Sequence, residues 1–240
     1  MKFFLIGNGF ISRKHKEAIK AIGGKIARSK KEADVVSVLT PNYLHFKQAK
    51  DAAENKKIVL VEKPLAISGE EVGKLADIKN VFTCHQLRYL PFKIPKAALY
   101  KIKIDFKAKR DKEYFKSWKG DKKKSGGILF NLAVHYFDLL FWLFGNPKRY
   151  RCCKLTDRLA EGRFYGKKYI ADWRFELGEN LENKRAFRIN NRNYNLSSQE
   201  NLHTKVYADL VNGKGVKASD VLKLFQIIEK IELSDGIKSF

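Results

Sequence analysis

Three polar residues interrupt the most apolar stretch of the chain, "GGILFNLAVHYFDLLFWLFG" at positions 126–145. Asn131, His135 and Asp138 are four and three residues apart, offsets that put side chains near one face of a helix. Histidine titrates near neutral pH and is the side chain best suited to take a proton from a hydroxyl. We therefore expect His135 to be a general base, against the ordinary alternative of a core histidine. Asn131 would bind the substrate hydroxyl or orient His135, and Asp138 would anchor the helix.

A second reactive side chain stands at the end of an expected strand. "IVLVEKP" (58–64) is a buried apolar run that ends in Glu62, Lys63 and Pro64. Ligands of open α/β sheets bind beyond the carboxyl ends of the strands. We expect Glu62 to orient this loop and Pro64 to fix it, with a cis peptide as one way of doing so.

A glycine turn, "GNGFIS" (7–12), follows the expected strand 2–7 and precedes the expected helix 13–24. Glycines let a backbone approach a pyrophosphate, and the helix N-terminus supplies donors, so the turn predicts dinucleotide binding. Ser12 replaces the third glycine. In such turns an acidic residue about 20 positions further along usually binds the ribose, but the corresponding stretch 23–34 is basic and lacks it. Arg28, Ser29 and Lys30 could face the 2′-phosphate of NADP or could be solvated surface.

The pattern of elements changes in the middle of the chain. Up to about residue 90, apolar strands alternate with amphipathic helices, which predicts a doubly wound parallel sheet. Beyond it, half-exposed strands indicate an open, mainly antiparallel sheet with helices on one face. We expect domains at 1–90 and 91–240.

In the first half, strands are expected at 2–7, 33–39, 58–64 and 81–87, with one very short strand at 25–28 if no element is lost, and helices at 13–24, 43–57 and 68–78. In the second, strands are expected at 97–110, 148–155, 163–177, 184–190 and 193–197, a polar loop at 111–127, and helices at 126–145, 201–212 and 219–234.

Composition limits the classes of function. The 240 residues are 44% hydrophobic and carry a net charge of +23. Lysines are scattered and no nucleic-acid motif is present, so we expect no nucleic-acid binding; a diphosphate-bearing small molecule suits a basic cleft. The chain has three cysteines, Cys84, Cys152 and Cys153, and their spacing is neither that of a disulfide framework nor that of metal ligands, so we expect no metal. No signal peptide is evident either, and together these observations indicate a protein of the reducing cytoplasm. Residues 126–145 carry polar groups at their centre, so we expect no membrane span.

Two motifs carry a family resemblance. "VSVLTPNYLH" (36–45) followed by "VEKPLAIS" (61–68) resembles the glucose–fructose oxidoreductase and inositol dehydrogenase (Gfo/Idh/MocA) family. The resemblance implies an N-terminal Rossmann domain that binds NAD, with NADP possible, and a C-terminal sheet that often forms a dimer or tetramer. Further segments are similar to bacterial UDP-N-acetyl-glucosaminuronate 3-dehydrogenases, which oxidise a sugar 3-hydroxyl in surface polysaccharide synthesis: "HQLRY" (85–89), "KSWKGDKKKSGG" (116–127), "NLAVHYFD" (131–138) and "LHTKVYADLVNGKG" (202–215).

The resemblance assigns roles to individual residues. Lys63 would point toward nicotinamide and substrate, where its charge stabilises an alkoxide and lowers the pKa of a neighbouring base. The catalytic residues are then Lys63, His135 and Asn131. The implied cofactor contacts are Gly7, Asn8, Gly9, Phe10, Ile11, Ser29, Thr40, Pro41, Asn42, His45, Glu62, Lys63 and Gln86. The implied substrate contacts are Arg88, Lys116, Trp118, Lys119, Asn131 and His135.

Two other functions compete with the nucleotide-sugar 3-dehydrogenase. One is a dehydrogenase of the same fold for another sugar, such as UDP-N-acetylglucosamine. Arg88 and the loop 111–127 would decide between them, because only the uronate needs a partner for its carboxylate. The other is a non-catalytic relative that binds a sugar or a protein. The shortened first half and the missing acidic residue favour it, whereas Lys63 and His135 argue against it.

Overall fold

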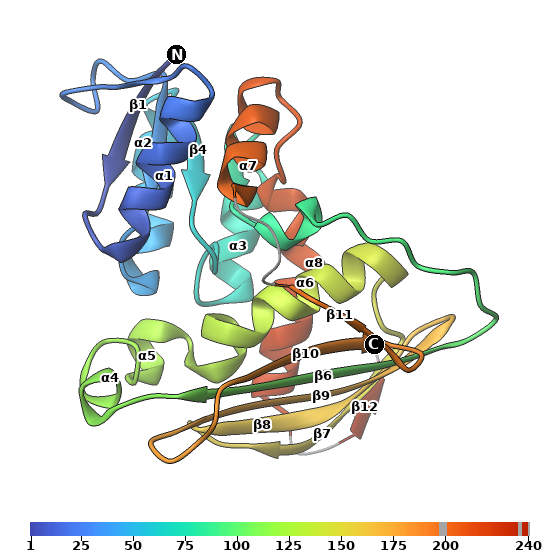
Figure 1. The fold of residues 1–240 in the computed structure, drawn as a ribbon. Helices are drawn as coiled ribbons and strands as arrows, with labels where there is room; N and C mark the ends of the chain where they lie inside the picture. Colours follow the sequence, from blue (N-terminus) through green and yellow to red (C-terminus); the bar gives the residue numbers. More distant parts are fainter. Residues whose placement is uncertain (197–200, 235–236, 240) are drawn as a thin grey trace. The chain divides into compact units, whose positions relative to one another are not determined.

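Five parallel strands in the order β2-β1-β3-β4-β5 form the first sheet (Figure 1). The two central strands are wholly apolar or nearly so, "VVSV" and "IVLV", as expected of strands covered on both faces. The predicted parallel sheet is therefore confirmed. The bounds are β1 Lys2–Ile6, β2 Lys25–Ile26, β3 Val35–Val38, β4 Ile58–Val61 and β5 Val81–Thr83.

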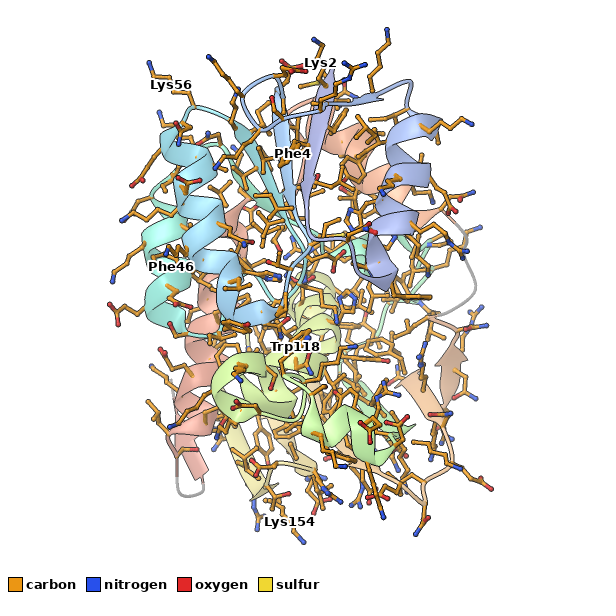
Figure 2. All side chains as sticks on the ribbon, turned by 90° about the vertical axis from the view of Figure 1, so that its left-hand side faces the viewer. Lys2, Phe4, Phe46, Lys56, Trp118 and Lys154 are labelled. Carbon is orange, nitrogen blue, oxygen red and sulfur yellow. The ribbon has the colours of Figure 1, made fainter. Side chains whose placement is uncertain are left out.

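Helices cover this sheet on both faces, with α1 and α2 on opposite sides (Figure 2). Helix α3 packs beside α2, and α7 packs beside α1 although it comes from the far end of the chain. Tyr207 and Leu210 of α7 join a core cluster with Phe3, Leu60 and Phe82 of the strands. The bounds are α1 Phe10–Ala21, α2 His45–Glu54, α3 Gly69–Ala76 and α7 Leu202–Val211, with 3-10 turns η1 Asn42–Leu44 and η2 Gln86–Tyr89.

The first sheet is shortened at one edge, as the sequence indicated. The very short strand expected at 25–28 is β2, only two residues long, and no helix connects it to β3. The order 2-1-3-4-5 places the change of winding direction between β1 and β3. In such sheets the crevice beyond the carboxyl ends of those two strands is the usual ligand site.

The second sheet has seven strands in the order β11-β10-β6-β9-β8-β7-β12. Its pairs are antiparallel apart from β6 with β9, so the predicted open, mainly antiparallel sheet is confirmed. The single segment expected at 163–177 is wrong: β8 and β9 are two strands of a hairpin that turns at Gly166. Residue 197, the end of the strand expected at 193–197, lies outside the described residues. The bounds are β6 Tyr100–Lys109, β7 Arg149–Leu155, β8 Leu159–Tyr165, β9 Tyr169–Gly178, β10 Lys184–Ile189, β11 Arg192–Tyr194 and β12 Ile237–Ser239.

The apolar stretch 126–145 forms the helix that covers one face of this sheet. It begins as a π-helix, η3 Leu129–Ala133, and continues as α6 Val134–Phe144. Phe137 of α6 is fully buried against Phe164, Trp173 and Phe175, with ring centroids 4.8, 5.3 and 5.5 Å away. By length and a mean hydropathy of 1.5, the helical segment Lys122–Phe144 could cross a membrane, but 61% of its most apolar 18-residue window is buried within the protein. Its packing is that of a core helix.

The polar loop expected at 111–127 is wrong in part, because it contains two short helices. They are α4 Lys112–Lys116 and α5 Lys122–Ser125. The side chains of Asp111 and Asp121 cap them by accepting hydrogen bonds from Tyr114 N and Lys123 N. The cap signals were present in the sequence, but lysine-rich runs of four or five residues show no helical periodicity.

The structure describes residues 1–196, 201–234 and 237–239 of the chain. Contacts divide the chain into two compact units, Met1–Tyr89 with Glu200–Gln226, and Leu90–Gln199 with Ile227–Phe240. The expected division into domains at 1–90 and 91–240 stays a prediction. Helix α7 belongs to the first unit, because it buries its apolar face against the parallel sheet. Helix α8, Ala218–Glu232, contributes to both units.

Candidate functional site

The two glycines of the turn after β1 are constrained by different surroundings. Gly7 has a φ of +106°, and a Cβ on it would lie 2.7 Å from the carbonyl oxygen of Leu39, the residue after β3. Gly9 has an extended backbone with φ −77°, and a Cβ on it would meet no atom within 4 Å. Gly7 therefore allows the β1 and β3 loops to touch at the switch point. Gly9 leaves space in front of the N-terminus of α1.

That helix terminus has features that a dinucleotide phosphate requires. Its first turn contains no acidic residue, and the N-cap is Gly9, which has no side chain to occupy the backbone N–H groups. Ser12 turns inward and donates to Gly9 O at 2.8 Å, so the replaced third glycine is a small buried residue. Phe10 is 85% exposed beside the turn. The residues present fit a bound dinucleotide.

His45 connects the two loops that follow β3 and β4. Its Nδ1 lies 2.7 Å from Pro64 O and its Nε2 lies 2.8 Å from Thr40 O. Burial lowers the pKa of His45, although both carbonyls oppose this shift, so the neutral ring has one N–H to donate between two acceptors. The Lys63–Pro64 peptide is cis, as the sequence suggested. His45 thus holds the two loops together, and its predicted contact with the cofactor stays a prediction.

Glu62 is a buried carboxylate surrounded by imidazoles. Its Oε1 lies 2.8 Å from His15 Nε2 and 3.5 Å from His203 Nε2. Burial by itself would raise the pKa of Glu62, but the hydrogen bonds from the two histidines outweigh it and hold that pKa well below its usual value. The other carboxylate oxygen accepts from the backbone N–H of Lys63 at 3.1 Å. Glu62 therefore holds the backbone of the loop that carries Lys63, and its predicted contact with the cofactor stays a prediction.

The remaining predicted residues of the first unit lie at strand ends or on the surface. Asn42 is buried in η1, and Gln86 and Arg88 lie on η2 after β5. Lys30 pairs with Asp51 of α2, and Ser29 accepts a 3.4 Å hydrogen bond from Glu32 N. Lys30 is thus held toward α2, whereas Arg28 is exposed just beyond β2.

In the second unit, the predicted histidine and amide lie where the helix changes its pitch. Asn131 belongs to the π-helix η3, and its Nδ2 donates to Tyr114 OH at 3.2 Å. His135 is half-buried in the first turn of α6, and Asp138 is buried one turn further on. A π-turn inside a helix is frequent at functional sites.

A cavity of about 200 Å³ opens beside Asn131. Cationic side chains in its wall include the predicted Lys119, together with Lys122 and Arg158; Asp157 is the acidic one. Arg158 stacks on Phe115 at 4.0 Å, and Lys122 pairs with Glu232 at 2.6 Å. Of the other predicted contacts, Lys116 pairs with Glu113 at 3.6 Å, and Trp118 lies between α4 and α5 (Figure 2).

Several candidate residues escaped sequence reasoning. Tyr114, Phe115 and Arg158 line the cavity, and His15 and Tyr207 stand behind Glu62. His15 lies in "RKHKEAIK", where a histidine among lysines in an amphipathic helix gives no signal of burial. Tyr207 lies in the segment "LHTKVYADLVNGKG", and the family resemblance of that segment implies no role for it. Contacts between residues almost 200 positions apart leave no local pattern.

Two sequence profiles of one oxidoreductase family match this chain. Residues 24–82 match the NAD-binding Rossmann fold, and residues 96–182 match the C-terminal alpha/beta domain. The two matches together cover more than half of the sequence. The first unit is therefore an NAD-binding Rossmann domain.

Individual relatives are more distant. Glucose-6-phosphate 3-dehydrogenase of Bacillus subtilis is 30% identical over 58% of this chain, which spans only 46% of that enzyme's length. The WlbA (WbpB) dehydrogenase of Thermus thermophilus, solved with NAD and UDP-GlcNAcA, superposes with a TM-score of 0.82 at 23% identity, covering 96% of this chain and 94% of that one. UDP-N-acetylglucosamine 3-dehydrogenase GnnA of Acidithiobacillus ferrooxidans gives 0.72 at 16% identity, covering 97% of each chain. At these identities the likeness to the solved structures concerns the fold.

Proposed function

This chain belongs to the Gfo/Idh/MocA family of oxidoreductases, and on that premise we propose that it oxidises the 3-hydroxyl of a nucleotide sugar by hydride transfer to NAD. The observation that carries the proposal is the loop Glu62-Lys63-Pro64 at the carboxyl end of β4. A buried carboxylate holds the Lys63 backbone there while the Lys63 side chain stays partly exposed. The substrate would be a UDP-N-acetyl-glucosaminuronate or a similar sugar, used for surface polysaccharide in the cytoplasm.

The chain's own residues would divide the work as follows. NAD, held by the glycine turn and the loop after β3, supplies the hydride acceptor. Lys63 stabilises the developing alkoxide by its charge. His135 takes the hydroxyl proton, and Asn131 binds the hydroxyl or orients His135. Ser29 and Gln86 would complete the cofactor contacts.

The nucleotide sugar would be recognised by the basic wall around Asn131. Lys119 and Arg158 suit a diphosphate or a carboxylate, because guanidinium and ammonium groups donate strongly to anionic oxygens. Trp118 and the rings of Tyr114 and Phe115 offer apolar faces to a sugar or uracil. Arg88 is the predicted carboxylate partner that would distinguish a uronate from UDP-N-acetylglucosamine.

The experiment that tests the proposal measures cofactor and turnover separately. Protein purified without added nucleotide is analysed by mass and absorbance for released NAD, and NAD binding is titrated. Oxidation of UDP-N-acetyl-glucosaminuronate and UDP-N-acetylglucosamine is then followed as NADH formation. We expect bound NAD and faster oxidation of the uronate. Failure to bind NAD at millimolar concentration would instead support the non-catalytic relative that the shortened sheet suggests.

Lys63→Ala tests the central residue. Because an electrostatic contact to a developing alkoxide typically contributes two to three orders of magnitude, we expect turnover to fall by about 10²–10³-fold while the unfolding temperature is unchanged. Lys47→Ala, an exposed lysine on α2, is the matched control and should retain turnover. Unchanged turnover in Lys63→Ala would refute its role.

A further inference from the structure

A group of four buried side chains gathers around Glu62. His15 comes from α1, Glu62 from the end of β4, Cys84 from the end of β5 and His203 from α7, and one donor atom from each lies within 4.8 Å of the others. His15 and Cys84 are completely buried, and the side chain of His203 is 12% exposed. Imidazole, thiol and carboxylate are ligands of transition metals, so the group is either a metal centre or a hydrogen-bonded network.

The distance between His15 and Glu62 distinguishes the two. Two ligands of a tetrahedral zinc ion, each bonded at about 2.0–2.2 Å, lie roughly 3.3–3.5 Å apart. His15 Nε2 and Glu62 Oε1 are 2.8 Å apart, which is the ordinary length of a charge-assisted hydrogen bond. These two atoms therefore bond to each other and are not spaced around an ion.

The network also determines the positions of its protons. A carboxylate only accepts, so His15 Nε2 carries the proton that reaches Glu62. If the ring is neutral, its Nδ1 is an acceptor, and the Tyr207 hydroxyl 2.8 Å away donates to it. The Ser37 hydroxyl, 2.8 Å from Tyr207 OH, then donates to Tyr207. The two hydroxyls thus favour the tautomer of His15 whose Nε2 carries the proton and donates to Glu62.

The network ends at the backbone of Lys63. Glu62 Oε2 accepts from the Lys63 N–H, so rotation of the Glu62 side chain would release that amide. We propose that His15 is a positioning residue, which through the Glu62 carboxylate fixes the backbone of Lys63. This role rests on the proposed function in which Lys63 acts on the substrate. Tyr207 and Ser37 support it by holding the His15 ring.

The kinetic test compares His15→Leu, which removes the donor, with His15→Gln, which restores an N–H donor at similar reach. Losing a partner that orients a metal ligand costs about 10–100-fold in activity, and we expect a loss of kcat of that size in His15→Leu. KM for NAD should be nearly unchanged, and His15→Gln should partly restore kcat. The hydrogen bond from His15 lowers the pKa of Glu62. Without it, Glu62 should take up a proton at higher pH, so the acid limb of the kcat profile should move to higher pH in His15→Leu. Equal losses in both variants with an unmoved acid limb would overturn the proposal.

Tyr207→Phe provides a second test in case the variants of the buried His15 do not fold. It keeps the ring and removes only the donor to His15. Its control is Tyr150→Phe, which removes another buried hydroxyl, 3.0 Å from Lys230 O in the second unit. We expect both to lower the unfolding temperature, but only Tyr207→Phe to shift the acid limb. A shift in neither variant would contradict the positioning role.

A measurement without turnover separates this inference from the proposed function. The carboxyl carbon of Glu62 is followed by ¹³C NMR in protein with labelled glutamate, and its signal is assigned by its loss in Glu62→Gln. We expect it to stay ionised down to pH 4.5 in the native protein and to titrate at higher pH in His15→Leu. Identical titrations would overturn the inference even if the enzyme is active. Stoichiometric zinc that is lost in Cys84→Ser but kept in the exposed Cys153→Ser would also overturn it.

Discussion

At the scale of single residues, Gly7 and Gly9 are two positions apart but carry different constraints. Gly7 is constrained by its backbone conformation and by a close contact, whereas a Cβ on Gly9 would meet no other atom of the protein. Sequence reasoning could assign both to a dinucleotide turn but could not distinguish them. The distinction needs the position of Leu39, which the fold brings within contact of Gly7.

The two glycines therefore predict opposite results on substitution by alanine. Gly7→Ala should destabilise the protein, because a positive φ costs a residue with a Cβ about 1–2 kcal/mol and the Cβ would meet Leu39 O. Gly9→Ala should leave the unfolding temperature unchanged and weaken NAD at least about tenfold, or ~1.4 kcal/mol. Thermal unfolding and NAD titration of both variants provide the check. Full NAD affinity in Gly9→Ala would exclude this turn from the cofactor site.

The buried environment of Glu62 leads us to expect that the free energy of unfolding depends on pH. Its pKa in the folded protein is held below its ordinary value of 4.5, so its contribution is fully present above that value and is lost as the pH falls toward the folded pKa. We expect the free energy of unfolding to decrease below about pH 4.5 less steeply in Glu62→Gln than in the native protein. Urea unfolding between pH 7 and 3 measures this. Glu54→Gln, on the exposed end of α2, should follow the native curve.

At the scale of elements, the apolar segment 126–145 is one helix with two roles. Its π-turn presents Asn131 to the cavity, and the following α6 supplies aromatic rings to the second sheet. The three-and-four spacing predicted one helix face for Asn131, His135 and Asp138. In the structure Asp138 is buried, whereas Asn131 and His135 are partly exposed, consistent with a structural role for the aspartate.

The packing role of α6 can be tested on the helix itself. Phe137→Ala removes a fully buried ring that contacts three aromatic neighbours, and such truncations cost about 3–5 kcal/mol. Trp142→Ala, on the same helix but 48% exposed, should cost far less. The free energies of unfolding of the two variants compare them directly. Equal losses would mean that the helix packs through another face.

At the scale of the whole molecule, the charge of +23 has no single location. Lysines such as Lys2, Lys56 and Lys154 project outward from different parts of the surface (Figure 2). On the outer face of the second sheet, two arginines pair with acidic residues of the neighbouring strand: Arg163 contacts Asp172 at 2.5 Å, and Arg174 contacts Glu161 at 2.5 Å. The family resemblance, which implies assembly through the C-terminal sheet, is the reason to expect association of two copies there.

We predict a dimer or tetramer that associates through the second sheet. Sedimentation of the purified chain should show it, and Arg174→Glu, which reverses a charge on the outer face of that sheet, should weaken it. Lys101→Glu, an exposed charge change at the start of β6, is the control. A native chain that sediments only as a monomer would contradict the prediction.

Local patterns in the sequence determined the fold class and the family of this protein. Continuous apolar runs predicted the parallel strands, half-exposed alternation predicted the second sheet, and the motifs "TPNYLH" and "VEKP" predicted the family, because each signal lies within a few consecutive residues. Only the tertiary structure decided which distant groups meet. It placed α7 on the first sheet and put His15 and Tyr207 behind Glu62, since burial and hydrogen bonding depend on neighbours in space. The sequence could thus propose a role for Lys63 through its motif, whereas the buried network that holds the Lys63 backbone could not be predicted from it.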